Sequence, residues 1–322
     1  EIWCQIIKGR NLPVSDMGGK SDPYVAITVN GKFKRTNYIE NVISPEWNEL
    51  VRFRTILPMR LELSNDILVE IYDTDAWIDD LMGSFTVNPG DIRLAVAEDE
   101  PFPPPRWYFL TKEGQPGIGG LLASFLIHKI RNVNKKIPRP LLPIPSSKKV
   151  IVYVLVIGTR RILPFRYSNV TAPYVQLRIG NQPPTSTSKG FQLNKKKSDS
   201  NHNFLEIIKL TADIPINPIY ASSLDVAIIE DRSLLFGGAT TVGATSVNLG
   251  RYLPWVTPEE RERLIKEEVD NIFKIDKNTD FEIFNAKIAN PHFENIDDDD
   301  VNRMDSARLE TEEDDFRISR NF

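Results

Sequence analysis

Two acidic loops in the first quarter of the chain carry the residue types that could do chemistry. Residues 12–24 read LPVSDMGGKSDPY and residues 72–83 read YDTDAWIDDLMG, and each loop follows a run typical of a β-strand. If the loops meet at one end of a β-sandwich, carboxylates converge there: Asp16, Asp22, Asp73, Asp75 and Asp80. Calcium suits such a cluster because it takes about six to eight oxygen ligands in loose geometry. The spacing therefore predicts a Ca2+ site, with plain turn aspartates as the simpler alternative.

Large apolar residues stand in the same two loops, where solvent-facing positions are usually polar. They are Met17, Trp77 and Ile78. A bound cation would cancel the charge of the carboxylates and accept phosphate oxygens, so that the local field changes sign. The amphipathic ring of Trp suits the headgroup boundary. We therefore expect these three residues to insert into an anionic phospholipid membrane; packing of Trp77 against a neighbouring domain is the alternative.

Composition and charge exclude several other classes of protein. The chain has 322 residues, enough for about two domains, a net charge of −4 and no basic stripe, so a nucleic-acid partner is not expected. A single cysteine, Cys4, precludes a disulfide within the chain and favours a reducing setting. The three histidines are scattered, and neither a Gly-x-Ser-x-Gly nor a His-Glu-x-x-His motif occurs, so the chain is not expected to be an enzyme.

Turn residues and strand-like runs divide the chain into four parts. Residues 1–111 contain short β-type runs separated by turns, which is typical of an antiparallel sandwich. Residues 112–147 form a Gly/Pro-rich linker with one strand candidate at 121–127, and residues 148–256 form a second strand-rich block. Residues 257–322 begin with a helix-starting signature and continue into an acidic, disordered segment.

The two strand-rich blocks resemble each other. Residues 173–179 read PYVQLRI and mirror residues 23–29, which read PYVAITV. Residues 224–229 mirror residues 67–72 in the same way. A repeat of about 150 residues is too long for a solenoid and indicates two copies of one domain.

Three motifs of the first block resemble those of the C2 domain, an eight-stranded calcium- and phospholipid-binding sandwich. They are DMGGKSDPYV at 16–25, SPEWNE at 44–49, and the second acidic loop at 72–83. The resemblance implies an all-β chain: two eight-stranded antiparallel C2-type β-sandwiches, followed by a short helix and the acidic tail.

The inter-domain stretch resembles that of ferlins, which are large tail-anchored proteins with several C2 domains acting in vesicle fusion and membrane repair. Its motifs are WYFL at 107–110, GLLASFL at 120–126 and PRPLLP at 138–143. The chain starts at Glu1 rather than Met, so we expect a piece of a longer protein. That protein would be anchored outside this segment, with the segment on the cytosolic face of a membrane. Fusion machinery and other C2 domains of the same polypeptide are the further partners that the resemblance suggests.

The second acidic loop departs from the family pattern. The last acidic ligand usually lies eight residues after the first, and that position here is Leu81. Counting back from Gly83 selects Asp80, so the loop is one residue short, and either Asp79 or Asp80 could be the final ligand.

Three basic residues follow the turn at 30–31, near the strand face that many relatives use for phosphoinositides. They are Lys32, Lys34 and Arg35, and clustered charges of this kind contribute about 1 kcal/mol each near an anionic surface. A solvated strand face is the alternative.

The second block has lost the acidic pattern. Alignment of the two blocks pairs Asp16 with Arg166, Asp22 with Ala172, Asp73 with Glu230, and Asp75 with Arg232. Since two carboxylates have become positive charges, we expect this block to work without calcium, with Lys195–Lys197 as a candidate anion patch.

The sequence thus predicts calcium-dependent phospholipid binding by part of a ferlin-like protein of vesicle fusion, exocytosis or membrane repair. The alternative is a calcium-independent scaffold or protein-interaction module built of C2 domains, in which the acidic loops serve as turns.

Overall fold

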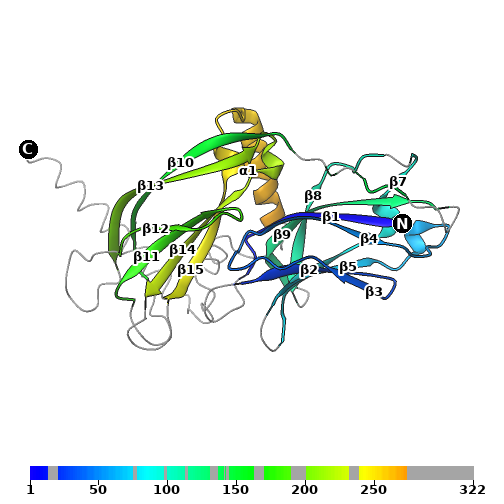
Figure 1. Cartoon of the computed structure of the whole chain (residues 1–322), viewed down its shortest axis with the longest axis horizontal. Helices are drawn as coiled ribbons and strands as arrows, with labels where there is room; N and C mark the ends of the chain where they lie inside the picture. Colours follow the sequence, from blue (N-terminus) through cyan, green and yellow to red (C-terminus); the bar gives the residue numbers. More distant parts are fainter. Residues whose placement is uncertain are drawn as a thin grey trace, which may run out of the picture. The chain divides into compact units, whose positions relative to one another are not determined.

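The computed structural model places most of the chain up to residue 273. It describes residues 1–13, 21–74, 78–97, 100–112, 115–130, 137–140, 142, 145–162, 170–189, 201–231 and 239–273. The chain divides into two compact units, residues 1–269 and residues 270–322. All of the described strands belong to the first unit (Figure 1).

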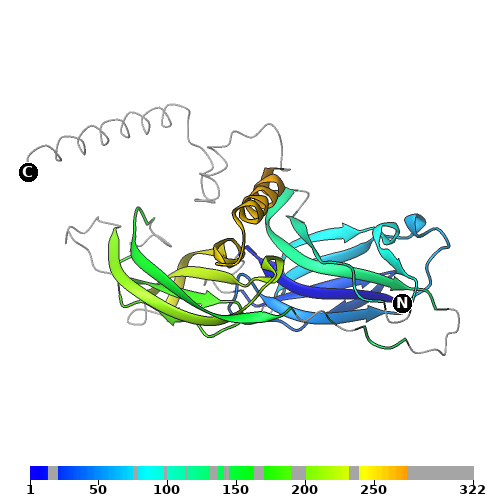
Figure 2. The ribbon, with the colours of Figure 1, turned by 90° about the horizontal axis from the view of Figure 1, so that it is seen from above.

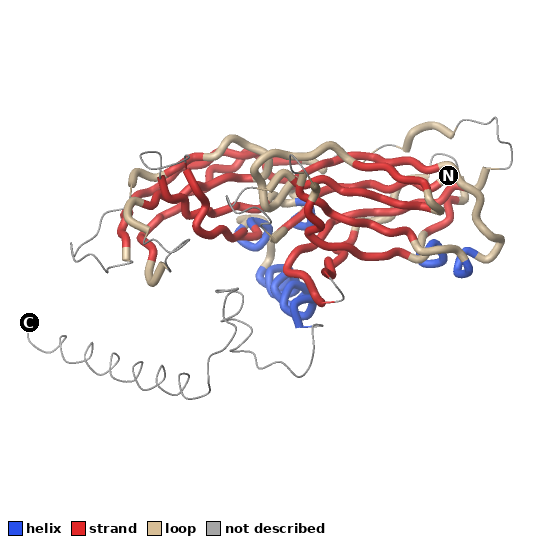
Figure 3. Tube along the Cα trace, turned by 90° about the horizontal axis from the view of Figure 1, so that it is seen from below, coloured by secondary structure: helices blue, strands red, loops and turns tan. Residues whose placement is uncertain are grey.

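The first part of this unit is a β-sandwich whose strands run through one continuous path of pairing (Figure 3). Its described strands are β1 (Ile2–Arg10), β2 (Pro23–Val29), β3 (Lys32–Arg35), β4 (Glu46–Phe53), β5 (Ile67–Asp73), β6 (Asp80–Val87), β7 (Arg93–Ala95), β8 (Arg106–Lys112) and β9 (Gln115–His128). The strand order is β3-β2-β5-β6-β8-β9-β1-β4, and the short β7 pairs with β9. The central strands β1 and β5 therefore have a partner on each edge, which protects their backbone groups from water.

Alternation of apolar and polar residues positions the core of the first sandwich. In β5, Ile67, Val69 and Ile71 are fully buried, while the intervening side chains are only half-buried. The hairpin between β2 and β3 turns at Asn30 and Gly31, both at positive φ, as a two-residue hairpin loop requires. The core of the sandwich thus forms on the inner face of this continuous sheet, and the loops lie at the strand ends.

The second part of the unit is a smaller sandwich (Figure 2). Its described strands are β10 (Ser147–Thr159), β11 (Pro173–Ile179), β12 (Thr185–Ser186), β13 (His202–Pro215), β14 (Ser223–Asp231) and β15 (Ala239–Asn248). They form a four-stranded sheet in the order β12-β11-β14-β15 and a two-stranded sheet of β10 and β13. Helix α1 (Pro258–Phe273) follows, and Leu264 on it packs against the core of this sandwich.

The two sandwiches share their strand order and register. The order β12-β11-β14-β15 matches β3-β2-β5-β6, and the pair β10-β13 matches β1-β4. Pro23 lies opposite Asp73 in one ladder, and Pro173 lies opposite Glu230 in the other. The structure therefore shows the internal repeat that the sequence predicts.

The described residues confirm some of the fold predictions and leave others untested. The all-β architecture with one helix is confirmed. Residues 121–127, the strand candidate of the predicted linker, belong to β9, and β9 pairs with β1 of the first sandwich. The predicted domain boundaries themselves stay a prediction. The predicted count of eight strands in each sandwich is not confirmed, since the described residues form nine strands in the first sandwich and six in the second. The acidic segment lies outside the described residues.

Helix α1 begins as its sequence signature predicts. Thr257 precedes it, and the Thr257 hydroxyl accepts a hydrogen bond from the Glu260 N–H at 3.2 Å, which satisfies one of the unpaired donors of the first turn. Among the helices that the structure describes, none is both long enough and apolar enough to cross a bilayer.

Polar groups join the two sandwiches. Arg178 donates from Nη1 to the carbonyl oxygens of Glu40 (3.2 Å) and Asn41 (2.8 Å). The Ser44 N–H donates to Asp225 Oδ2 at 3.3 Å. Lys8, in the bulge of β1, is buried and donates to the carbonyl of Ala221. Burial lowers the pKa of Lys8 to about 8 and raises the pKa of Asp225 to about 6.

We expect Asp225→Asn to stabilise the folded chain at neutral pH. The pKa of Asp225 is higher in the fold than in the unfolded chain, so the wild type loses stability as pH rises from about 4 to about 6. Asn keeps an acceptor for Ser44 without the buried charge, so the gain above pH 6 should reach up to about 3 kcal/mol. Thermal unfolding of both proteins at pH 7.5 and pH 4 tests this: the difference should nearly vanish at pH 4. A variant that is less stable at pH 7.5 would contradict it.

Candidate functional site

Two of the predicted calcium ligands meet where β2 begins and β5 ends. Asp73 is the last residue of β5 and is fully buried. Its Oδ1 accepts a hydrogen bond from the Asp22 N–H at 2.6 Å, which ties the two loops together. The Oδ1 of Asp22 accepts in turn from the Asn41 N–H at 2.8 Å. The structure therefore brings carboxylates of both acidic loops to one end of the first sandwich.

The ladder between β5 and β6 separates the two adjacent candidates for the final ligand. Asp80 lies directly opposite Asp73, and residues opposite each other in an antiparallel pair project from the same face. Asp79 has its carboxylate bound elsewhere: Oδ2 accepts from the Tyr24 hydroxyl at 2.7 Å and Oδ1 from the Thr74 hydroxyl at 3.2 Å. Burial, followed by this hydrogen bond to Asp79, raises the pKa of Tyr24 to about 12. The geometry favours Asp80 as the partner of Asp73 and gives Asp79 a role in holding the loop.

Other predicted site residues lie outside the described part of the chain: Asp16, Met17, Asp75 and Trp77. Of the predicted membrane-inserting residues, the structure places Ile78, whose side chain is 79% exposed beside the acidic loop. Within the residues that the structure describes, no three metal-binding side chains converge closely enough to hold an ion on their own. The donors that are in place are carboxylate oxygens, the ligand type that calcium prefers.

The predicted basic residues line one edge of the sandwich, between β3 and β4. Lys34 Nζ donates to the Arg52 carbonyl at 2.7 Å, and Lys32 Nζ donates to the Arg54 carbonyl. The guanidinium of Arg35 instead lies 4.9 Å from the centre of the Tyr24 ring. Sequence reasoning missed Arg52, in β4, as a further basic residue of this edge; Arg54, just after β4, is instead paired with the Glu1 carboxylate at 2.7 Å. The two arginines at alternate positions were the available signal.

Glu230 occupies the corresponding position of the second sandwich and is hydrogen-bonded to the facing loop. It occupies the register position of Asp73, and its carboxylate is buried. Oε1 accepts from both the N–H (2.9 Å) and the hydroxyl (3.0 Å) of Thr171, and Oε2 accepts from the Ala172 N–H at 3.1 Å. These contacts join the same two loops that Asp22 and Asp73 join in the first sandwich. Arg166, Arg232 and Lys195–Lys197 lie outside the described residues.

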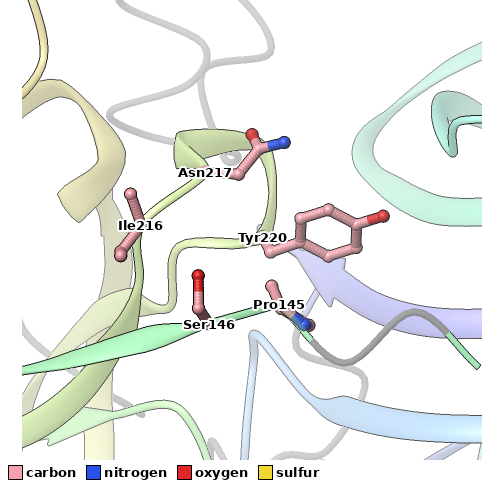
Figure 4. A pocket seen from close by; sticks show the side chains of 5 residues that line it. All are labelled: Pro145, Ser146, Ile216, Asn217 and Tyr220. Carbon is pink, nitrogen blue, oxygen red and sulfur yellow. The ribbon is translucent and has the colours of Figure 1, made fainter.

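A hollow of about 280 Å3 lies elsewhere, where β10 begins and β13 ends (Figure 4). It is lined by Pro145, Ser146, Ile216, Asn217 and Tyr220. Among the described residues, the lining holds no carboxylate, imidazole or basic group that could bind a metal or act as a general base. The loop end of the first sandwich remains the candidate functional site.

A comparison with known proteins bears on the first sandwich. Residues 1–108 match the family model of the C2 domain. This part of the chain is therefore similar to C2 domains, and Asp22, Asp73 and Asp80 lie within the matched residues.

The relatives are proteins with several C2 domains. The chain is 31% identical over 112 residues to multiple C2 domain and transmembrane region protein 8 of Arabidopsis thaliana, covering 35% of this chain and 11% of that protein. It is 39% identical over 94 residues to multiple C2 and transmembrane domain-containing protein 2 of Mus musculus, covering 29% of this chain and 10% of that protein. The aligned part therefore spans only about a tenth of the length of these relatives. These relatives are named as proteins with multiple C2 domains, and neither is named as a ferlin.

Among solved structures, the tandem C2 domains of extended synaptotagmin 2 align with 79% of this chain and 80% of that chain. The sequence identity is 19% and the TM-score is 0.33.

Proposed function

We propose that the first sandwich binds Ca2+ at its loop end and then docks on an anionic phospholipid membrane. The observation that carries the proposal is the junction of Asp22 and Asp73, with Asp80 opposite Asp73 in the ladder. In this proposal Asp16 and Asp75 complete the ligand set from the same loops. Without a cation, the assembled carboxylates repel anionic headgroups.

In this proposal, three kinds of group at this end contact the membrane: the bound cation, the apolar loop residues and the basic residues. Bound Ca2+ would neutralise the carboxylates and accept phosphate oxygens of the lipid headgroups. Ile78 is exposed beside the site and would insert into the headgroup boundary, together with Met17 and Trp77. Lys32, Lys34 and Arg35 would contact anionic headgroups along the β3 edge, aided by Arg52.

The second sandwich enters the proposal as a module that works without calcium. Glu230 already uses both carboxylate oxygens to accept hydrogen bonds from the facing loop. A cation there would have to displace these hydrogen bonds. Ala172, in the place of Asp22, also supplies no carboxylate.

At the level of the whole protein, we propose that the chain is part of a membrane-associated protein with several C2 domains. The names of the relatives support this class, since they describe multiple C2 domains together with transmembrane regions. The inter-domain motifs that resemble ferlins favour a role in vesicle fusion, exocytosis or membrane repair, on the cytosolic face of a membrane.

Co-sedimentation of the 322-residue chain with phosphatidylserine vesicles tests the proposal. We expect pelleting with calcium and little pelleting with a chelator, and pelleting should weaken as salt rises. Phosphatidylcholine vesicles serve as the uncharged control. Equal pelleting with and without calcium, or none at millimolar calcium, would overturn the calcium switch and favour the scaffold alternative.

A further inference from the structure

Strands β10 and β13 of the second sandwich present an apolar face that points away from its core. The two strands pair along their length, with Leu155 directly opposite Ile207. The alternate side chains Val152, Val154 and Val156 pack against the core, so the residues between them point outward. We call this side the outer face, and its apolar residues are 49–68% exposed: Ile151, Tyr153, Leu155, Ile157, Leu205 and Ile207.

Contact with water does not explain the composition of the outer face. An antiparallel sheet that faces water on one side carries mainly polar residues there. On the outer face, six apolar side chains instead form one block across two paired strands. The described residues of the second sandwich therefore leave a contiguous apolar patch, and a patch of this kind marks an interaction surface rather than a solvated one.

Basic residues surround this apolar patch. Lys209 lies within it, Lys149 continues the outer face at one end, and Arg160 and Arg161 follow β10 at the other end. All four are exposed, and Asp213 is the one acidic residue among the outward residues of the two strands. Four basic residues against one acidic residue give a local charge of +3, in a chain whose net charge is −4. This local excess of positive charge favours an anionic partner.

We propose that the outer face of the second sandwich docks on an anionic phospholipid membrane without calcium. The apolar block would enter the headgroup boundary, where the amphipathic ring of Tyr153 is suited to lie. Lys209 lies opposite Tyr153 in the ladder and would reach the lipid phosphates with its ammonium group while its apolar stem stays on the patch. This contact gives the second sandwich a membrane function that does not depend on the calcium site of the first.

Charge favours a membrane over a second copy of the chain as the occupant of the outer face. Two copies that met through this face would bring two sets of basic residues together, and like charges that face each other oppose association. An anionic bilayer instead attracts the same residues, and the attraction grows with the number of basic side chains near its surface. The basic residues therefore select between two occupants that apolar area alone would leave open.

Docking through the outer face should be weak on its own. A single myristoyl chain gives a membrane association constant of only about 10⁴ M⁻¹, and the outer face offers partly exposed side chains rather than a free acyl chain. We therefore expect little pelleting in chelator below about 0.1 mM lipid, and measurable pelleting at several-fold higher lipid. The calcium-dependent step is measured below this concentration and the outer face above it.

Co-sedimentation in excess chelator, with phosphatidylserine vesicles at about 1 mM lipid, tests the outer face in the 322-residue chain. Leu155→Thr/Ile207→Thr removes apolar area and keeps β-branched residues that suit a strand. We expect the association constant of this variant to be at least about fivefold lower than that of the wild type. Its calcium-dependent pelleting at low lipid should be unchanged, so failure of one site is distinguishable from failure of the other.

The matched control is Ile56→Thr/Met59→Thr, which makes the same kind of change at two side chains of the first sandwich that are each 92% exposed. It should leave calcium-free binding unchanged. Absence of wild-type pelleting in chelator at the higher lipid concentration would overturn the proposal, and so would equal binding by the wild type and Leu155→Thr/Ile207→Thr. A dimer in sedimentation equilibrium that Leu155→Thr/Ile207→Thr dissociates would assign the outer face to a second copy of the chain and would also overturn it.

Discussion

Asp73→Asn is expected to weaken calcium-dependent binding to phosphatidylserine vesicles strongly. Asp73 is fully buried where the two acidic loops meet, and its Oδ1 holds the Asp22 N–H. Asn keeps an oxygen for that hydrogen bond and removes the charge, so the loops should stay joined while calcium affinity falls roughly tenfold or more. Calorimetric titration of calcium into the full chain, beside vesicle co-sedimentation, measures both effects.

Asp79→Asn is the matched control for Asp73→Asn, since it removes the same charge from the same loop. Tyr24 and Thr74 already bind the Asp79 carboxylate, so calcium affinity should change much less than in Asp73→Asn. Equal losses in the two variants would place Asp79 among the ligands. Unchanged calcium binding in Asp73→Asn would remove the loop junction from the site altogether.

Glu230→Ala should loosen the second sandwich without changing calcium binding by the first. The substitution leaves the Thr171 N–H, the Thr171 hydroxyl and the Ala172 N–H without their acceptor. Unsatisfied groups of this kind cost about 1–3 kcal/mol each, less where water replaces the acceptor, so we expect a loss of about 2–3 kcal/mol. Urea unfolding, followed by hydrogen exchange in β11 and β14, localises the effect.

The conservative variant Glu230→Gln keeps an acceptor oxygen and should lose less stability than Glu230→Ala. Calcium titration of both variants provides the second readout. A loss of calcium sites in either variant would contradict the role of Glu230 as a hydrogen-bond acceptor that joins the two loops, and it would mean that the second sandwich holds an ion.

Local patterns were enough to predict the sandwich, whereas the calcium site at its loop end stays a prediction. The turn at Asn30 and Gly31 and the alternation in β5 have the signatures of their structures in the sequence itself. Counting back from Gly83 also selected Asp80, and the structure shows why that glycine is a sound reference point. A Cβ at Gly83 would lie 2.9 Å from the Cβ of Leu110, so the position needs a residue without a side chain.

Features that depend on register or on contacts distant in sequence could not be predicted. Choosing between Asp79 and Asp80 requires the irregularity between Ile71 and Tyr72 in the ladder, which no local pattern reveals. The substitution of Asp by Glu230 was visible in the sequence, but the reach of the longer side chain to the facing loop was not. Membership of β9 in the first sandwich depends on pairing with β1, roughly a hundred residues or more away along the chain, and the Gly/Pro-rich stretch before it favoured a linker.

The main chain of Asn41 links the candidate calcium site to the second sandwich, so calcium affinity can depend on the contact between the sandwiches. Its N–H donates to Asp22, and its carbonyl oxygen accepts from Arg178 of the second sandwich, each at 2.8 Å. One residue thus serves both the candidate calcium site and the contact between the sandwiches. If calcium binding shifts Asn41, it also changes the free energy of the Arg178 contact. By thermodynamic reciprocity, the Arg178 contact then changes the free energy of calcium binding by the same amount. A calcium constant measured on the isolated first sandwich would then describe a different equilibrium from the one in the joined pair.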